Sequence, residues 1–293
     1  MKNGGNLASY AAVRDILGTH ALAPKKNYGQ NFLIDSFVLD KIVNAAGITA
    51  DDVVIEIGPG LGALTAALAA RAKKVIAVEI DASLIPVLRD TLAGFDNVEL
   101  INADVLKLDL GACIAAAGAQ SVKLVANLPY YITTPIVFHV LESKLPVESM
   151  TVMVQKEVAE RMKAQASTKA YGAVTVAMRY YADVSLVANV PPNCFLPRPN
   201  VDSAVVQLTL LPKPRVTVAD EAFFFKIVRA AFAMRRKTLV NCLSADEELG
   251  FDKQTVVDAL ISCGLSESIR GEALTLEWFA QLVEVLCALR TEG

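Results

Sequence analysis

The chain has 293 residues, of which 54% are hydrophobic and 20% are charged. This composition excludes a disordered, collagen-like or coiled-coil protein, and the length favours one large domain with a small one appended. The formal net charge of −3 weighs against a nucleic-acid partner, yet seven basic and two acidic residues fall between Lys213 and Lys237, so a local basic face can coexist with an acidic total.

Short apolar runs alternate with helix-compatible segments through the first two thirds of the chain. Each run is four to six residues long, as expected for strands that are buried on both faces of a sheet. The expected strands are Val53–Ile57, Val75–Ile80, Val98–Ile101, Val122–Ala126 and Met150–Val154. Segments such as Leu61–Ala72 and Ser83–Ala93 have a helical pattern. This alternation predicts an α/β fold with a doubly wound parallel sheet.

The first expected strand leads into a glycine-rich loop, Gly58-Pro59-Gly60-Leu61-Gly62, and then into a helix. Glycines permit a tight turn and let the backbone approach a ligand. Glu79 lies twenty-one residues past Gly58, at the end of the second strand, where a carboxylate can accept hydrogen bonds from ribose hydroxyls. The loop also satisfies a dinucleotide pattern, but Glu56, two residues before Gly58, favours an S-adenosylmethionine loop.

Asp104 follows the third strand, where it can contact a cofactor or act as a turn or helix-cap residue. An uncharged run of eighteen residues, Leu124–Leu141, then meets the length criterion for a membrane-spanning helix. Pro129 and Pro135 would break its helical hydrogen bonds, so we expect no membrane segment. The N-terminus lacks the apolar stretch of a signal peptide, which makes the cytoplasm the expected location.

The tetrapeptide Asn127-Leu128-Pro129-Tyr130 follows the fourth strand directly. The exocyclic amine of adenine is a poor nucleophile, because its lone pair is delocalised into the ring, and it needs geometry more than a base. An Asn oxygen and a neighbouring backbone carbonyl can accept both of its hydrogens and orient it toward a methyl donor. Pro129 fixes the backbone that aims the carbonyl, and Tyr130 offers a stacking face for an extruded base. Taken alone, the tetrapeptide is more typical of a turn. Its place one strand after the glycine loop, Glu79 and Asp104 favours a site for methyl transfer.

Two further apolar runs, Val184–Val190 and Ala204–Leu210, flank a proline-rich loop and could close the sheet as a hairpin-like pair. After Leu211 the sequence Pro-Lys-Pro breaks the pattern, and everything beyond Asp220 has a helical pattern. We therefore expect a methyltransferase domain over residues 1–211 and a helical domain over residues 212–293. The five cysteines and two histidines have no metal-ligand spacing, so neither a metal site nor a disulfide framework is expected.

The sequence resembles the ribosomal RNA adenine dimethyltransferases, and most closely their bacterial small-subunit branch. The resemblance covers about residues 10–290. Its marks are KKNYGQNFL at 25–33, the glycine loop, NLPYYITTP at 127–135, FLPRPNVDS at 195–203 and FAMRRKTL at 232–239. It implies a Rossmann-like class I methyltransferase domain with a mostly parallel, seven-stranded sheet, followed by a small all-helical domain.

The resemblance also implies roles for individual positions. The residues that match the family's S-adenosylmethionine contacts are Asn31, Leu33, Gly58, Glu79, Asp104 and Asn127. Asn127, Pro129 and Tyr130 match the site of the target amine. Phe195 matches a second aromatic wall of the base pocket, although a core phenylalanine fits the same position. Arg235, Arg236 and Lys237 match a segment that contacts RNA or docks the two domains, and Tyr28 departs from the family's usual residue and receives no role.

The implied reaction is dimethylation of the N6 amines of two adjacent adenosines in a hairpin near the 3′ end of 16S rRNA. The implied partner is an immature 30S subunit, and the implied enzyme is a monomer that uses S-adenosylmethionine. Two alternatives are a macrolide-resistance type of 23S rRNA adenine methyltransferase and a ribosome-assembly checkpoint factor whose methylation is dispensable. The continuation YITTP after Tyr130 favours the small-subunit branch. A nicotinamide dehydrogenase would leave Asn127 to Tyr130 without a function.

Overall fold

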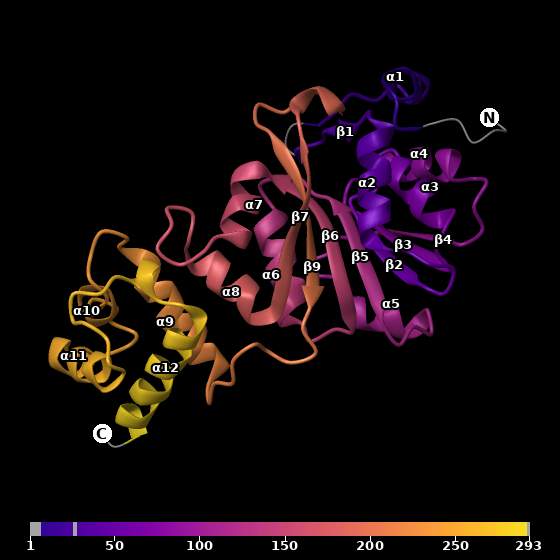
Figure 1. The fold of residues 1–293 in the computed structure, drawn as a ribbon. Coiled ribbons are helices and arrows are strands. Elements are labelled where there is room, and N and C mark those ends of the chain that lie inside the picture. Colours follow the sequence, from indigo (N-terminus) through magenta and orange to yellow (C-terminus); the bar gives the residue numbers. More distant parts are fainter. Residues whose placement is uncertain (1–6, 26–27, 292–293) are drawn as a thin grey trace. The chain divides into compact units, whose positions relative to one another are not determined.

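The structure is a computed structural model that describes residues 7–25 and 28–291 (Figure 1). The chain forms two compact units. One consists of Met1–Ala159 and Ser185–Leu210, and the other of Glu160–Val184 and Leu211–Gly293. The second segment of this helical unit starts after Leu210, close to the point where the sequence pattern changes. The unit differs from the expected helical domain in one respect, because residues 160–184, which we assigned to the first domain, cluster with it.

A seven-stranded sheet forms the centre of the first unit, with the strand order β4-β3-β2-β5-β6-β9-β7. Its strands are β2 (Val53–Ile57), β3 (Lys74–Glu79), β4 (Val98–Asn102), β5 (Val122–Asn127), β6 (Val147–Gln155), β7 (Ala182–Val190) and β9 (Ser203–Leu210). The pairs from β4 to β6 are parallel, and β9 is antiparallel to β6. The mostly parallel, doubly wound fold that the sequence predicts is confirmed, with β9 inserted between β6 and β7.

Helices flank this sheet (Figure 1). They are α1 (Tyr10–Thr19), α2 (Ser36–Ala46), α3 (Ala63–Ala69), α4 (Ile85–Thr91), α5 (Leu110–Ala116) and α6 (Thr133–Glu142), with the 3-10 turns η2 (Ala82–Leu84) and η3 (Pro192–Cys194). Ile42 of α2 and Leu68 of α3 belong to a core cluster that also holds Val54, Val75 and Val125 of the sheet. Burying these apolar side chains stabilises the sheet that carries the site.

The composition of the central strands explains where the site lies. All five residues of β2 are buried, and Ile55 pairs with Ile76 of β3 on one side and Leu124 of β5 on the other. Strands that are apolar on both faces need helical cover on both, which parallel strands obtain through their crossover helices. Because parallel strands end at the same edge of a sheet, the loops after Ile57, Glu79 and Asn127 meet there.

A second, two-stranded sheet was not predicted. β1 (Phe32–Leu33) pairs antiparallel with β8 (Phe195–Leu196), so that Phe32 is opposite Leu196 and Leu33 is opposite Phe195. The backbone N–H of Ile34 also donates to the carbonyl of Cys194 at 2.8 Å. These contacts join the N-terminal segment to the proline-rich loop, two regions that are more than 150 residues apart in the sequence.

The second unit is helical. Its helices are α8 (Ala173–Tyr181), α9 (Glu221–Ala233), α10 (Leu239–Ser244), α11 (Lys253–Ser262) and α12 (Leu276–Thr291), with the turn η4 (Gly271–Ala273); α7 (Lys156–Lys163) leads into it from β6. Tyr180 of α8 stacks on Phe224 of α9 with ring centroids 5.2 Å apart, and its hydroxyl donates to Glu221 at 3.2 Å. This aromatic contact explains why α8 belongs to the helical unit. No helix within the described residues is long and apolar enough to cross a membrane.

Candidate active site

A cavity lies at the carboxyl edge of the parallel strands in the first unit. Its walls come from the loops after β2, β3, β4 and β5, from the N-terminal segment and from the start of β8. Every residue that the sequence assigns to the cofactor or the target amine lines it, namely Asn31, Leu33, Gly58, Glu79, Asp104, Asn127, Pro129, Tyr130 and Phe195. The structure therefore brings together side chains that are spread over more than 160 positions of the sequence.

The glycine loop forms the floor of this cavity. Gly58 and Gly60 have φ values of 71° and 60°, in the left-handed region that favours glycine. The N–H of Gly58 donates to the carbonyl of Val78 at 2.9 Å, which ties the loop to β3. A Cβ at Gly60 would lie 3.3 Å from the ring of Phe32, so the loop and the N-terminal segment are already in close contact.

Two acidic side chains follow the ends of β3 and β4. Glu79 is only 5% exposed, and its Oε1 and Oε2 accept the backbone N–H groups of Asp81 at 2.8 Å and Gly60 at 3.3 Å. Burial is the main reason that the pKa of Glu79 is raised. Asp104 is held by the N–H of Leu106, which donates to its Oδ1 at 3.1 Å. Both carboxylates are thus held by backbone donors, and both residues line the cavity.

Glu56 is a second buried carboxyl in the cavity wall. It is 1% exposed, and its Oε2 has no hydrogen-bond partner among the described residues. Burial, together with the negative charge of Glu79, raises the pKa of Glu56 to about 8. A buried carboxyl with an unused oxygen beside a cavity is suited to a ligand that brings a donor or a positive charge.

The backbone around Asn127 orients its amide. Its Nδ2 donates to the carbonyl of Asn31 at 3.4 Å, which leaves Oδ1 as the acceptor. The carbonyl of Pro129 accepts the Oγ1 of Thr133 at 3.0 Å and the N–H of Ile132 at 3.2 Å. No described backbone N–H donates to the carbonyl of Leu128. Asn127 and Leu128 are adjacent in the chain and both line the cavity, so each has an acceptor to offer there, the side-chain Oδ1 and the backbone carbonyl respectively.

Two aromatic residues border the same corner. The hydroxyl of Tyr130 lies 2.5 Å from Oγ of Ser203, and burial of the phenol raises its pKa. Phe195 is 1% exposed and packs in the core cluster with Leu33 and Val205, so most of its ring is core even though it contributes to the cavity wall. Cys194 next to it is a packing residue of the same core cluster; its Sγ lies 3.3 Å from Oδ2 of Asp35, and burial raises its pKa to about 11.

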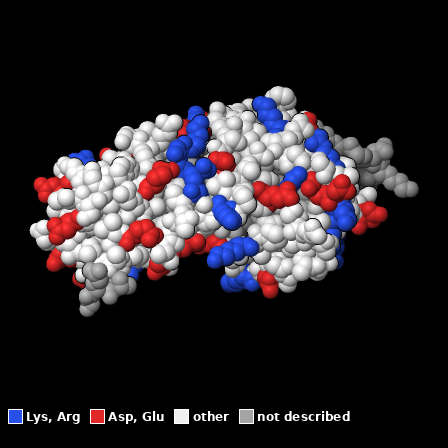
Figure 2. All heavy atoms as spheres, turned by 60° about the horizontal axis from the view of Figure 1, so that its bottom comes forward, with Lys and Arg blue, Asp and Glu red and all other residues white. Residues whose placement is uncertain are grey.

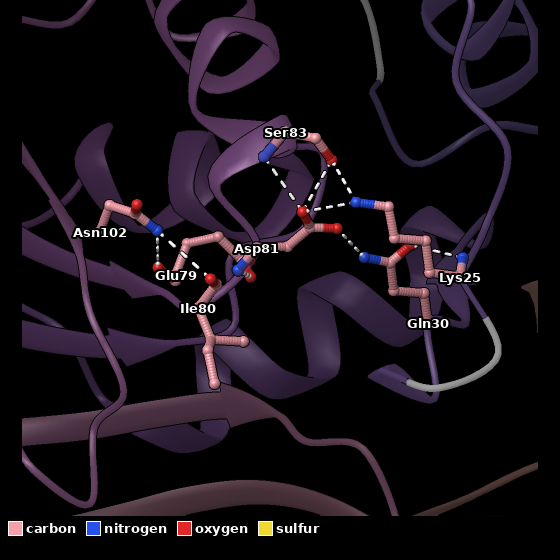
Figure 3. A network of polar contacts seen from close by, with 7 residues as sticks. All are labelled: Lys25, Gln30, Glu79, Ile80, Asp81, Ser83 and Asn102. Carbon is pink, nitrogen blue, oxygen red and sulfur yellow. Dashed lines mark hydrogen bonds and ion pairs between the residues drawn. The ribbon is translucent and has the colours of Figure 1, made fainter.

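Sequence reasoning missed part of the N-terminal segment and its anchor. Tyr28, Gly29 and Gln30 line the cavity beside Asn31, and Gln30 donates to Asp81 at 2.9 Å (Figure 3). Asp81 is a buried residue two positions after Glu79 that no pattern had singled out. The available signal was its position after a strand end, shared with Asp104. Lys26 and Asn27 of the family motif lie outside the described residues.

The three basic residues of the helical unit differ in their contacts. Arg235 donates to the carbonyl of Lys169 and lies 3.4 Å from Oε2 of Glu272. Arg236 and Lys237 are exposed, and no side-chain contact is recorded for either within residues 7–25 and 28–291. Figure 2 shows acidic side chains dispersed over this unit, so its visible face is not uniformly basic. In the described part of the chain, no group of three or more His, Cys, Asp or Glu residues could hold a metal ion.

Comparisons with known proteins agree on one family. Residues 22–261 match the family model described as ribosomal RNA adenine dimethylase. A protein of Lachnoclostridium phytofermentans named ribosomal RNA small subunit methyltransferase A is 50% identical over 93% of this chain and 94% of its own length. A protein of the same name from Geobacillus thermodenitrificans is 49% identical over 97% and 98%.

Two solved structures are similar along most of their length. The crystal structure of a dimethyladenosine transferase from Plasmodium falciparum has a TM-score of 0.75 at 28% identity, covering 89% of this chain and 98% of that one. The crystal structure of the 23S rRNA methyltransferase ErmE has a TM-score of 0.66 at 29% identity, covering 88% and 100%. The resemblance stated from the sequence motifs is therefore confirmed over nearly the whole chain.

Proposed function

Because this chain belongs to the ribosomal RNA adenine dimethylase family, we propose that it dimethylates the N6 amines of two adjacent adenosines near the 3′ end of 16S rRNA. The observation that carries this proposal is the cavity in which the Asn127 amide, the glycine loop and the nucleoside-binding carboxylates meet. The enzyme is an S-adenosylmethionine-dependent rRNA adenine dimethyltransferase that acts during small-subunit biogenesis. Its substrate is the RNA of an immature 30S subunit, which it binds as a monomer.

Sequence identity favours the small-subunit substrate over the 23S alternative. The relatives named ribosomal RNA small subunit methyltransferase A are 48–50% identical to this chain, whereas the 23S rRNA methyltransferase structure is 29% identical. Both kinds of protein share the fold, so the fold does not decide between them. The segment YITTP after Tyr130, which resembles the small-subunit branch, supports the same choice.

The described residues fit S-adenosylmethionine. Glu79 and Asp104 offer fixed carboxylates at the ends of β3 and β4 for the ribose and the adenine. Gly58 lets the backbone approach the methionine end, and the unpartnered Oε2 of Glu56 lies in the wall of the same cavity. When bound, S-adenosylmethionine supplies a methyl group that is already activated by its sulfonium charge. Asn31 and Leu33 also line the cavity.

Asn127 and Leu128 orient the target amine. An adenine amine that donates one hydrogen to Asn127 Oδ1 and the other to Leu128 O has both N–H directions fixed, which leaves its lone pair to face the methyl donor. Asn127 keeps its acceptor in place because its Nδ2 is held by Asn31. Pro129 restricts the conformation of Leu128, the residue before it. Such positioning can lower a barrier by roughly 7–11 kcal/mol in well-aligned cases.

Tyr130 and Phe195 flank the base. The Tyr130 hydroxyl is held by Ser203, so the orientation of its ring is fixed before RNA arrives. Stacking of a base on an aromatic ring contributes about 1–3 kcal/mol. Phe195, being nearly inaccessible, supports the wall from behind more than it exposes a face.

The helical unit supplies RNA contacts outside the catalytic cavity. Arg236 and Lys237 are exposed cations without recorded protein partners in the described part of the chain, which suits phosphate binding. Arg235 has a different role, because its guanidinium is engaged by Lys169 and Glu272. Of the two roles that the sequence left open, RNA contact is thus proposed for Arg236 and Lys237, whereas Arg235 contacts Lys169 and Glu272 within its own unit and is assigned to local structure, not to docking of the two domains.

The decisive experiment is incubation of the protein with labelled S-adenosylmethionine and small subunits that lack this modification, followed by nucleoside analysis. We expect N6,N6-dimethyladenosine at two adjacent positions of 16S rRNA. Asn127→Ala should lower product formation at least a hundredfold, because the acceptor that orients the amine is lost. Label in 23S rRNA instead, or equal turnover in this variant, would contradict the proposal.

The checkpoint alternative is tested with the same variant. Intact cofactor residues argue against a binding factor without activity, but one protein can do both. We expect cells that carry only Asn127→Ala to accumulate unmethylated small subunits. Normal growth and maturation with this variant would assign the main role to binding.

A further inference from the structure

Asp81 is the most highly connected buried carboxylate near the active-site cavity, and none of the roles described above includes it. It is 3% exposed and lies two residues after Glu79, at the start of the turn η2 (Figure 3). Its Oδ1 accepts Nζ of Lys25 at 2.8 Å and both the N–H and the hydroxyl of Ser83 at 3.0 and 2.7 Å. Its Oδ2 accepts Nε2 of Gln30 at 2.9 Å.

These contacts connect the cofactor carboxylate to the N-terminal segment. The N–H of Asp81 donates to Oε1 of Glu79, so the backbone of Asp81 holds one oxygen of the ribose-binding residue. Its side chain holds Lys25 and Gln30 from the other direction. Gln30 is fixed at both ends of its amide, because its Oε1 also accepts the backbone N–H of Lys25 at 2.8 Å.

Gln30 in turn precedes a residue of the site. Asn31 lines the cavity, and its carbonyl accepts Nδ2 of Asn127. A change in the position of Gln30 would therefore shift Asn31 in the cavity wall and, through the carbonyl of Asn31, the amide of Asn127. Asp81 thus contacts, directly or through one neighbour, the residues on both sides of the cofactor.

We propose that Asp81 is a positioning residue that, through Lys25 and Gln30, holds Asn31 and Glu79 in the arrangement that binds the cofactor. This inference rests on the proposed use of S-adenosylmethionine. Asp81 itself does not touch the cofactor. It acts through the residues that do, and its loss should weaken cofactor binding more than it slows methyl transfer.

The electrostatics of the network agree with this role. Burial alone would raise the pKa of Asp81, but the hydrogen bonds from Lys25, Ser83 and Gln30 outweigh it and lower the pKa. The carboxylate is therefore ionised at neutral pH and attracts its donors. Replacing it by an amide removes the charge and one acceptor, while Lys25, whose side chain is 38% exposed, can turn to solvent. The variant should consequently fold with a loosened segment.

The chain offers a matched control. Asp52 forms an ion pair with Lys123 at 2.9 Å, with side chains that are 20% and 17% exposed. Its carboxylate also accepts from Thr49, and its pKa is likewise lowered. Asp52 precedes β2, at the edge of the sheet away from the cavity, and neither it nor Lys123 lines the cavity. Asp52→Asn thus removes an ion pair of nearly the same length from a partly buried position without touching the site.

The test is calorimetric binding of S-adenosylhomocysteine to the full-length protein, which needs neither RNA nor turnover. We expect Asp81→Asn to raise Kd about tenfold, in the range expected for a lost charge-assisted hydrogen bond. Asp52→Asn should lower Tm and leave Kd within twofold of the unmodified protein. In turnover with saturating RNA, Asp81→Asn should raise KM for S-adenosylmethionine and change kcat less than threefold.

Three further variants separate positioning from general stability. Lys25→Met should reproduce part of the Kd increase, and Lys25→Arg should restore it. In the double variant of Gln30→Leu and Asp81→Asn, the loss of binding free energy should be smaller than the sum of the two single losses, because both substitutions remove the same contact. An unchanged Kd in Asp81→Asn, or equal increases in Asp81→Asn and Asp52→Asn, would overturn the inference. If the unmodified protein itself bound no S-adenosylhomocysteine, the proposed function would fail instead.

Discussion

The Tyr130 side chain makes two separable contributions. Its hydroxyl contacts Ser203, and its ring borders the cavity. Tyr130→Phe keeps the ring, so we expect kcat/KM within a few fold of the unmodified enzyme. Tyr130→Ala removes the stacking face and should lower kcat/KM roughly 5- to 150-fold, the equivalent of about 1–3 kcal/mol.

Steady-state kinetics with undermethylated small subunits measures both variants. Binding of S-adenosylhomocysteine serves as the control, since the loss of a base-stacking surface should leave it nearly unchanged. Equal activity of Tyr130→Ala and the unmodified enzyme would remove Tyr130 from the base site.

Glu56 should make stability depend on pH. Its folded-state pKa of about 8 lies above the ordinary value of 4.5, so the folded protein keeps a proton that the unfolded chain releases. The stability that this proton contributes is complete below about pH 4.5 and is lost as pH rises through about 8. Glu56→Gln cannot ionise, and its Tm relative to the unmodified protein should rise between pH 5 and pH 8.

Thermal unfolding at several pH values measures this difference. Glu142, which is exposed on α6, provides the control, because Glu142→Gln should give a constant offset. A constant offset for Glu56→Gln as well would contradict the raised pKa. The buried carboxyl of Glu56 thus lowers the stability of the folded protein as pH rises toward 8.

Position in the fold made some side chains predictable. Glu79 and Asn127 end their strands and Asp104 follows one, and parallel strands bring such ends to one edge, so sequence position alone indicated a shared site. Asp81 and Gln30 are 51 residues apart and joined only by tertiary folding. No periodicity reports such a pair, and a short polar side chain in a loop is most often a surface residue.

Among the elements, the N-terminal segment is held closely against the loop after β5. Gly29 has a φ of 59°, and a Cβ there would lie 3.1 Å from Cβ of Pro129 and 3.4 Å from the ring of Tyr131. Gly29→Ala should therefore displace the loop that carries Asn127. We expect a severalfold loss of kcat/KM in addition to a loss of stability of about 1 kcal/mol from the left-handed backbone.

Gly118 isolates the backbone effect. It has a φ of 64° in the loop after α5, and nothing lies within 4 Å of a Cβ placed on it. Gly118→Ala should lower Tm by a similar amount and leave kcat/KM unchanged. Equal activity in the two variants would show that the contact between Gly29 and Pro129 is unimportant for catalysis.

The elements of the sheet were largely predictable, and their limits were less so. β2 has the bounds expected from its apolar run. β6 begins at Val147, three residues before the expected start at Met150, because Glu148 and Ser149 interrupt the apolar pattern but not the strand. The two-residue strands β1 and β8 carry too few residues for any pattern. Proline at the start of α4 explains why the expected helix Ser83–Ala93 divides into η2 and α4.

Only two of the three cations in the basic segment of the helical unit, Arg236 and Lys237, should act in RNA binding. Arg236→Gln and Lys237→Gln should each reduce the slope of log K against log salt concentration by about 1, if each cation contacts one phosphate. Arg235→Gln should leave the slope unchanged and lower Tm, because it removes the contacts to Lys169 and Glu272.

Binding of unmodified small subunits at several salt concentrations measures these slopes. Lys253→Gln, at the exposed start of α11, is the control within the same unit. If Arg236→Gln and Lys237→Gln had the same slope as the unmodified protein, both residues would be solvated surface cations that do not contact RNA. The acidic total of the chain is compatible with the prediction, because a few cations decide the slope and the net charge does not.

The path of the chain limits what can be cut away or exchanged. Residues 160–184 enter the helical unit before the sheet is finished, and the chain then returns to add β9. If the chain were divided at residue 211, Tyr180 would be on the N-terminal fragment and Phe224 on the C-terminal fragment. The stacking contact between the two rings would then be lost, and the Tyr180 ring would be exposed. The helical unit therefore cannot be exchanged between proteins as one continuous segment. A recombination that transfers it intact must also transfer the part of the first unit that lies between residues 184 and 211 of the sequence.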